Sequence, residues 1–248
     1  MTRFELTELD EETVIQAGGE EEITLSVAAY QFEPLIDRLI VHFTGETWRA
    51  EVATAKKEFF LDAGIMDEQT DHFEMRMTQF LDWYLFSRLL TGRTVTPSQY
   101  ALEIDEFQMT ADERVLFECL AETHHSLFEF LRLRGRDIYV RDLILDKEIV
   151  VRDSQVNIGF SRDEIFEARL VPYGADFIFA RSFCFHPVEA RSFIDQEVHK
   201  LQEVEFESEA KPVTEAFLLR LMKMRYKYEQ FRHLKLEYIY TNEKKVRF

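Results

Sequence analysis

The residues Glu122-Thr-His124-His125 are the first place in this sequence where residue types and spacing suit a chemical role. Glu-x-x-His on a helix puts a carboxylate and an imidazole on one face, as in bundles that hold paired iron ions. Such a centre also needs a second Glu-x-x-His and two more inward glutamates, which the other histidines do not supply. A metal-dependent enzyme at Glu122 and His125 is therefore only an alternative, and we predict no metal ligand and no cofactor.

The two cysteines are the next candidates, because a thiolate is a strong nucleophile. Cys119 lies in a predicted helix among apolar residues, and Cys184 lies between Phe183 and Phe185. Both settings are typical of a buried thiol that packs as a small hydrophobe. His186 shares a strand face with Cys184, but neither a Gly-x-Ser-x-Gly elbow nor a glycine-rich phosphate loop is present. The sequence therefore favours a non-catalytic protein.

The C-terminal region combines basic and aromatic side chains. An apolar stripe from Val213 to Phe231 recurs at steps of three and four residues, which predicts a helix. This helix packs either on its own domain or on a partner, which includes a second copy of the chain. The interaction residues that we predict here are Arg225, Tyr228, Phe231, Arg232 and Lys235.

The charge distribution bears on nucleic-acid binding. A net charge of −17 argues against binding of phosphate backbones over the whole surface. Acidic residues are concentrated in residues 1–30, however, and basic residues are concentrated in residues 211–248. A second group of basic residues, all arginine, consists of Arg132, Arg134, Arg136, Arg141, Arg152, Arg162, Arg169 and Arg181. Nucleic-acid binding by these two regions is therefore the second hypothesis.

Helical periodicity organises residues 34–132, which we predict to be a helical domain. Pro34 suits the first turn of one helix, and Thr96-Pro97 suits the start of another. Thr110-Ala-Asp-Glu113 has the pattern of a capping box, and we expect its helix to continue through Leu131. The central helix follows Asp67 and stops at Gly92, and its predicted core residues are Phe80, Trp83 and Phe86.

The pattern changes to short β-branched runs over residues 133–187. Five short strands with tight connections, one of them Val156–Phe160, predict a small SH3-like or OB-like barrel. Helical spacing returns over 188–248. Residues 1–33 form an acidic, partly disordered segment, in which Ile23–Val27 is either a strand or the approach to a helix. The predicted fold class is α+β.

Composition agrees with this architecture. The chain has 248 residues, of which 46% are hydrophobic, and its 23 Phe and 9 Tyr predict a core of packed aromatic rings. It has neither an N-terminal signal pattern nor a run of about 18 apolar residues, so we predict no membrane contact. Two cysteines suit a reducing compartment, which makes the predicted location the cytoplasm.

Several short motifs resemble a known family. Phe73-x-x-Arg76-x-x-x-Phe80-x-x-Trp83, Gly92-Arg-Thr94, Arg141-Asp142-Leu143 and Ala168-Arg169-Leu170 occur in this order across roughly residues 35–187. They are similar to a group of uncharacterised bacterial proteins, many of which carry a C-terminal SEC-C zinc-binding tail. No cysteine-rich tail follows His186, so no zinc role is carried over. The resemblance implies a bacterial source and a shared module without a known reaction.

The sequence thus predicts a non-catalytic interaction or regulatory protein, an adaptor in the bacterial cytoplasm. Its expected partner is another protein, and a homodimer is possible. The acidic N-terminal segment and the basic aromatic C-terminal helix are the expected contact surfaces. The alternatives are nucleic-acid binding through the barrel rim and the C-terminal helix, and metal-dependent catalysis at Glu122 and His125.

Overall fold

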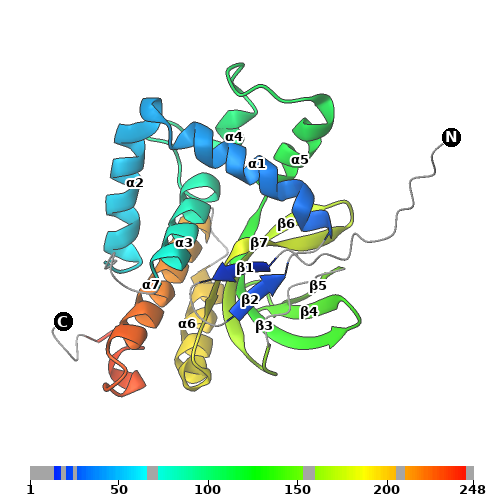
Figure 1. Cartoon of the computed structure of the whole chain (residues 1–248). Coiled ribbons are helices and arrows are strands. Elements are labelled where there is room, and N and C mark those ends of the chain that lie inside the picture. The colour runs from blue at the N-terminus through cyan, green and yellow to red at the C-terminus, as the bar shows by residue number, and fades with distance from the viewer. Residues whose placement is uncertain are drawn as a thin grey trace.

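The structure is a computed structural model (Figure 1), and it describes residues 14–17, 21–24, 27–65, 72–152, 160–204 and 210–243. The helices of these residues are α1 (Val27–Phe43), α2 (Arg49–Asp62), α3 (Phe73–Phe86), α4 (Pro97–Ala101), α5 (Ala111–Ala121), α6 (Arg191–Val204) and α7 (Ala210–Gln230). Their 3-10 helices are Glu46–Trp48, Val188–Ala190 and Leu236–Tyr238. The strands are β1 (Val14–Ala17), β2 (Glu21–Thr24), β3 (His124–Arg134), β4 (Asp137–Asp142), β5 (Lys147–Val151), β6 (Ile165–Tyr173) and β7 (Asp176–Phe185). None of the helices described is long and apolar enough to cross a membrane.

Strands β3 to β7 form one five-stranded mixed sheet, which confirms the α+β class. The long strand β3 pairs with β6 through its first half and with β4 through its second half. The strand order β3-β4-β5-β7-β6 therefore returns on itself, and the sheet is ring-like. All neighbours are antiparallel except β5 and β7, which run parallel where Val151 pairs with Phe177. Strands β1 and β2 form a separate antiparallel pair.

The helices cover the sheet from one side and from its ends (Figure 1). Helix α3 packs on β7, helix α7 packs on β3, and α2 contacts both α3 and α7. Helix α1 crosses above them and contacts α3, α4, α5 and β7. The helical part and the sheet thus share one interface, along which the first hydrophobic core runs.

The predicted helix from Thr110 to Leu131 is wrong in its second half. Its capping box is confirmed, because Thr110 and Glu113 each accept a bond from the other's backbone N–H. The helix nevertheless ends at Ala121, and the next residues form β3. Leu127 and Phe128 are fully buried. An apolar run buried on both faces has no period that separates strand from helix.

Two other predicted boundaries also move. The sheet begins at His124, whereas the barrel was predicted to begin at residue 133. The five strands of the sheet include β3, so the sheet has five strands without the predicted strand Val156–Phe160. Residues 153–159 lie outside the described part of the chain. At the other end, α1 begins at Val27 and encloses Pro34, which does not lie in the first turn. The segment Ile23–Val27 combines both alternatives, since β2 ends at Thr24 and α1 follows.

The central helix is α3, and its role in the core is largely as predicted. Phe80 is fully buried and Phe86 is 9% exposed, while Trp83 is partly buried against the same core. The phenol of Tyr84 donates a hydrogen bond of 3.0 Å to the Phe43 carbonyl on α1. Three polar side chains of α3 are also buried, and these are Arg76, Gln79 and Asp82. Buried polar groups need partners, so α3 also organises the polar interior of the molecule.

Candidate functional site

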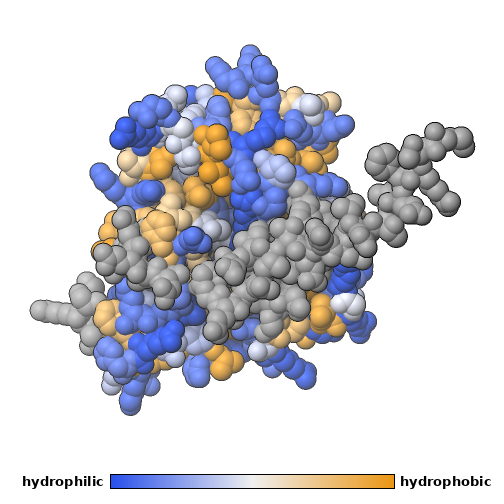
Figure 2. All heavy atoms as spheres, in the orientation of Figure 1, coloured by the Kyte–Doolittle hydropathy of each residue, from blue (hydrophilic) through white to orange (hydrophobic). Residues whose placement is uncertain are grey.

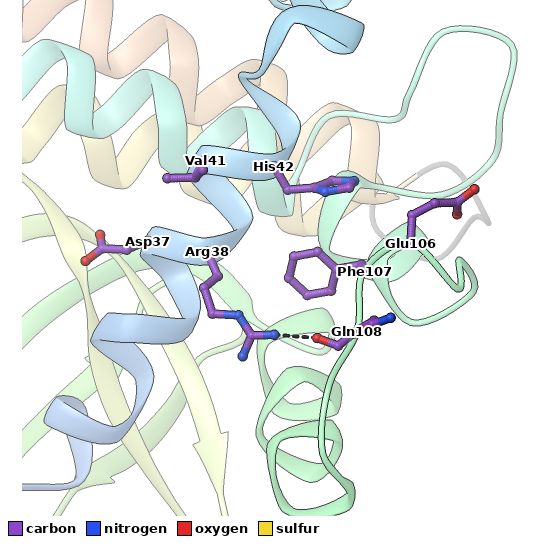
Figure 3. A pocket seen from close by; sticks show the side chains of 7 residues that line it. All are labelled: Asp37, Arg38, Val41, His42, Glu106, Phe107 and Gln108. Atoms are coloured by element: carbon purple, nitrogen blue, oxygen red, sulfur yellow. Dashed lines mark hydrogen bonds between the residues drawn. The ribbon is translucent and has the colours of Figure 1, made fainter.

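A solvent-open groove lies between α1 and the segment that precedes α5 (Figure 3). Its volume is about 410 Å³, and the residues that line it are Asp37, Arg38, Val41, His42, Glu106, Phe107 and Gln108. In Figure 3 the side chains of Arg38 and His42 extend from α1 toward the loop, and the Phe107 ring lies beside both, whereas Asp37 and Val41 point away from it. The volume falls within the range of protein binding pockets, about 300–1,000 Å³.

Contacts between Arg38 and the loop hold the two walls of the groove together. The Arg38 guanidinium donates hydrogen bonds to the Glu113 carboxylate and to the Gln108 carbonyl. It also lies over the Phe107 ring, 5.4 Å from the ring centre. His42 meets the same ring edge-on, with 5.2 Å between the ring centres. Burial lowers the pKa of His42, although Glu106 opposes this effect. Charge and aromatic contacts therefore shape the groove before any ligand arrives.

Val41 gives the groove an exposed apolar wall. Its side chain is 73% exposed, whereas Phe107 beside it is only 6% exposed. The loop side of the groove is acidic, because Glu106 lines it and is exposed, and the exposed Glu103 and Asp105 precede it in the same loop. Figure 2 shows exposed hydrophobic side chains gathered over the helical part amid hydrophilic ones. The groove thus offers an apolar contact beside negative charge.

The sequence analysis did not predict this groove, although the apolar pattern of α1 sets one of its residues apart. The apolar stripe of α1 consists of Leu35, Ile36, Leu39, Ile40 and Phe43. Val41 is apolar but lies off that stripe, so its side chain is not expected to face the core. Nothing local in the sequence indicated that the 106–108 loop would lie beside it.

The interior holds a polar network centred on Arg169 of β6. Its guanidinium pairs with Asp82 of α3 at 2.7 Å and donates to the Ser87 hydroxyl at 2.7 Å. A third bond, of 3.3 Å, reaches the Thr123 hydroxyl. Arg169 is 2% exposed and Asp82 is 9% exposed. The network therefore ties α3 to the sheet through a buried ion pair.

Glu215 of α7 extends this network. Ser87 donates to Glu215 at 2.8 Å, and His125 Nδ1 lies 3.1 Å from the same carboxylate. Burial by itself raises the pKa of Glu215, but His125, Arg169 and Ser87 outweigh burial and hold it at about 2. This carboxylate is therefore ionised in the folded protein down to acidic pH.

The helix that the Glu122/His125 metal hypothesis assumed does not extend over both residues. Glu122 ends helix α5 and has non-helical backbone angles, while His125 lies in β3. The two residues therefore do not share a helix face, which the Glu-x-x-His pattern requires. The imidazole of His125 is bonded to Glu215 instead.

We expect Glu215→Gln to change how stability depends on pH. The folded pKa of Glu215 lies below its unfolded value, so its stabilisation is complete above pH 4.5 and is lost as the pH falls toward 2. At pH 7 the free energy of unfolding of the wild type should exceed that of the variant by on the order of 1–3 kcal/mol. This difference should shrink below pH 4.5. Urea unfolding at a series of pH values measures it. A difference that stays constant from pH 7 to pH 3 would contradict the assignment, and Glu118→Gln on the exposed face of α5 is the control.

A second buried cluster joins β6, β7 and the C-terminal segment. His186 Nε2 lies 3.0 Å from Glu167 Oε1, and His186 Nδ1 lies 3.0 Å from the Tyr240 hydroxyl. Cys184 lies directly across from Glu167 in the β6–β7 pairing. Burial, with Glu215 adding to it, raises the pKa of Glu167, and burial lowers the pKa of His186 to about 3. The imidazole of His186 is therefore neutral at pH 7, and it shares a hydrogen bond with the Glu167 carboxyl.

The predicted interaction residues of the C-terminal region do not form one surface. Arg225 donates to the Phe185 carbonyl and pairs with Glu229 at 2.7 Å. Tyr228 and Phe231 pack against the second hydrophobic core, whose buried α7 residues include Phe217, Leu218, Leu221 and Met224. Only Arg232 and Lys235 are exposed. The apolar stripe of α7 thus packs within its own chain, which leaves a small basic surface for a partner.

The arginines of the sheet are largely paired with neighbouring carboxylates. Arg132 pairs with Glu148 at 2.7 Å, and Arg152 pairs with Asp137 at 2.6 Å. Four more arginines of the group singled out in the sequence also form ion pairs, and these are Arg141, Arg162, Arg169 and Arg181. An arginine held by a carboxylate contributes little net positive field to attract a phosphate backbone. This pairing gives the nucleic-acid hypothesis no support.

The structure defines an α+β protein in which helices cover a ring-like mixed sheet and a groove opens beside α1. The model of a "Family of unknown function (DUF7986)" matches residues 49–224, which is more than half of the chain, so the chain belongs to this family. The match contains the sheet, the Arg169 network, the residues Glu167, Cys184 and His186, and the loop side of the groove, while α1 precedes it and Tyr240 follows it. No curated protein matches the chain, and no solved structure matches it. The resemblance to SEC-C-tail proteins stays a prediction.

Proposed function

We propose that this protein is a non-catalytic interaction protein that binds a segment of another protein in the groove beside α1. The observation that carries the proposal is the open groove itself, which Val41, an apolar side chain that is 73% exposed, lines together with Phe107. By contrast, the described thiol–imidazole–carboxylate cluster of Cys184, His186 and Glu167 is buried, where a substrate has no access. An adaptor role in the bacterial cytoplasm is consistent with these features.

Charge complementarity indicates what kind of segment fits. The loop side of the groove carries Glu106, with Glu103 and Asp105 before it in the same loop, and the whole chain has a net charge of −17. Arg38, the basic residue of the groove, is already held by Glu113. A basic segment is therefore attracted to this loop, and an apolar side chain on it removes Val41 from water. We infer that the partner presents an apolar residue flanked by Lys or Arg.

Selection of displayed random peptides on the full chain tests this proposal. We expect enriched sequences to combine an apolar residue with adjacent basic residues. Val41→Glu puts a charge on the apolar wall without touching the core, and it should weaken binding by about 10-fold or more, a loss of about 1.4 kcal/mol. The matched control is Leu61→Glu on α2, an equally exposed site at 70%, which should bind as the wild type does.

Two results would contradict the groove as the binding site. One is that the wild type retains no more of the selected peptides than the Val41→Glu protein does. The other is that Val41→Glu and Leu61→Glu lose binding equally. A parallel arm uses random-sequence single-stranded RNA and DNA at low salt. Retention of either with affinity that falls steeply as salt rises would favour the nucleic-acid alternative instead.

A further inference from the structure

Three metal-binding side chains meet inside the molecule, away from the groove. One ligand atom each of Glu167, Cys184 and His186 lies within 4.8 Å of the other two. Their exposures are 1%, 6% and 4%, so all three are buried. Glu167 and Cys184 are cross-strand partners, and His186 follows Cys184 by two residues. Neighbouring strands of one sheet therefore position all three donors.

One carboxylate oxygen of this cluster lacks a hydrogen-bond partner among the described residues. Glu167 Oε1 contacts His186 Nε2, but Glu167 Oε2 is buried and has no hydrogen-bond partner among the described residues. Buried carboxylate oxygens are almost always bonded, so an orphaned oxygen requires an explanation. An ion held between the carboxylate, the thiol and the imidazole supplies the missing partner.

We propose that Glu167, Cys184 and His186 bind a zinc ion. Zinc binds carboxylate oxygen, thiolate sulfur and imidazole nitrogen donors. Three protein ligands leave one position of its tetrahedron for a further donor. When the ion binds, the thiol loses its proton, and the Glu167–His186 pair loses the proton it shares. Two negative ligands then balance one divalent cation, so the net charge of the core stays the same.

Tyr240 gives the imidazole the orientation that such a site needs. Its hydroxyl lies 3.0 Å from His186 Nδ1, and it is buried with 3% exposure. A ligating histidine usually donates its other ring N–H to an oxygen, which sets the tautomer and turns the free nitrogen toward the metal. With Nδ1–H donated to Tyr240, Nε2 presents its lone pair to the cluster. Tyr240 is thus a positioning residue for the site.

The test measures zinc content and cobalt absorption of the full-length protein. The chain has only two cysteines, so Cys119→Ala leaves Cys184 as its single thiol. Wild type and Cys119→Ala, refolded with Zn²⁺ and freed of loose metal, should both retain about one zinc per chain. With Co²⁺ in its place, both should show thiolate-to-cobalt charge-transfer absorption. In Cys119→Ala that absorption can come only from Cys184.

Two variants test the individual roles. Cys184→Ala keeps a small apolar side chain in the core, and it should lose both the zinc and the absorption. Tyr240→Phe keeps the ring but removes the hydroxyl, and it should weaken zinc binding roughly 10- to 100-fold, as outer-shell substitutions do. Should Cys184→Ala fail to fold, the spectrum of Cys119→Ala decides by itself. Absence of zinc and of the cobalt absorption from folded Cys119→Ala would overturn the proposal, as would their retention in Cys184→Ala.

Discussion

Replacing Arg169 with methionine is expected to cost roughly 3–5 kcal/mol of unfolding free energy. Arg169 pairs with Asp82 at 2.7 Å, and both residues are buried. Methionine fills a similar volume but leaves the Asp82 carboxylate in the core without its cation. Breaking a buried pair from one side is costly because the remaining charge has lost its water and has no partner. The melting temperature should fall by roughly 6–20 °C, since each kcal/mol lost shifts the melting temperature of a domain of this size by about 2–4 °C.

A double variant separates this charge effect from a loss of packing. In Arg169→Met/Asp82→Leu no charge is left behind, so the double variant should be more stable than Arg169→Met alone. Arg162→Met is the exposed control, because its side chain is 88% exposed and it should change stability by no more than about 0.5 kcal/mol. A double variant less stable than both single variants would show that shape, and not charge, dominates at this position.

Phe166→Ala is the second large expected effect, a loss of about 3–5 kcal/mol. Phe166 lies on β6, is fully buried, and its ring contacts several others. The nearest ring is Phe160 at 5.2 Å, followed by Phe185 at 5.4 Å. Further rings surround it at 6.0–6.1 Å, and these are Phe128, Phe183 and Phe179. Truncation leaves a cavity that strands held in a ring cannot readily close.

Chemical denaturation measures this loss and its cause. Phe166→Leu keeps most of the volume and should cost less than about 1.5 kcal/mol. Leu133→Ala on β3 removes an apolar side chain that is 56% exposed, and it should cost little. A Phe166→Ala loss no larger than that of Leu133→Ala would mean that the phenylalanine cluster is not the centre of the sheet's core.

Local signals accounted for much of the helical part. The N-cap at Thr96 and the capping box at Thr110 act within three residues, and both form as their sequence patterns predict. The central helix, in contrast, ends at Phe86 and not at the predicted Gly92, which lies in the following turn with φ +74°, a backbone conformation that glycine adopts without strain. The two caps depend on a few neighbouring residues, so they can be read from the chain alone.

Polar side chains within apolar patterns were harder to interpret. Arg76, Gln79 and Asp82 lie on α3 among core residues, and each is buried in the structure. Their partners come from distant segments, as when Gln79 donates to the Phe183 carbonyl at 3.1 Å and Asp82 pairs with Arg169. Only the folded chain shows which buried charge is matched and which carboxylate oxygen is left without a partner.

The sequence by itself thus determined the α+β class, the starts of α4 and α5 and an aromatic core, because propensity, capping and periodicity act over a few residues. The tertiary structure alone decided that residues 124–134 form a strand, since a run buried on both faces carries no period. It also decided that the α7 stripe packs within the chain and that Val41 and Phe107 line one groove. Finally, it brought Glu167 beside Cys184 and His186, because strand pairing joins residues that are far apart in the sequence.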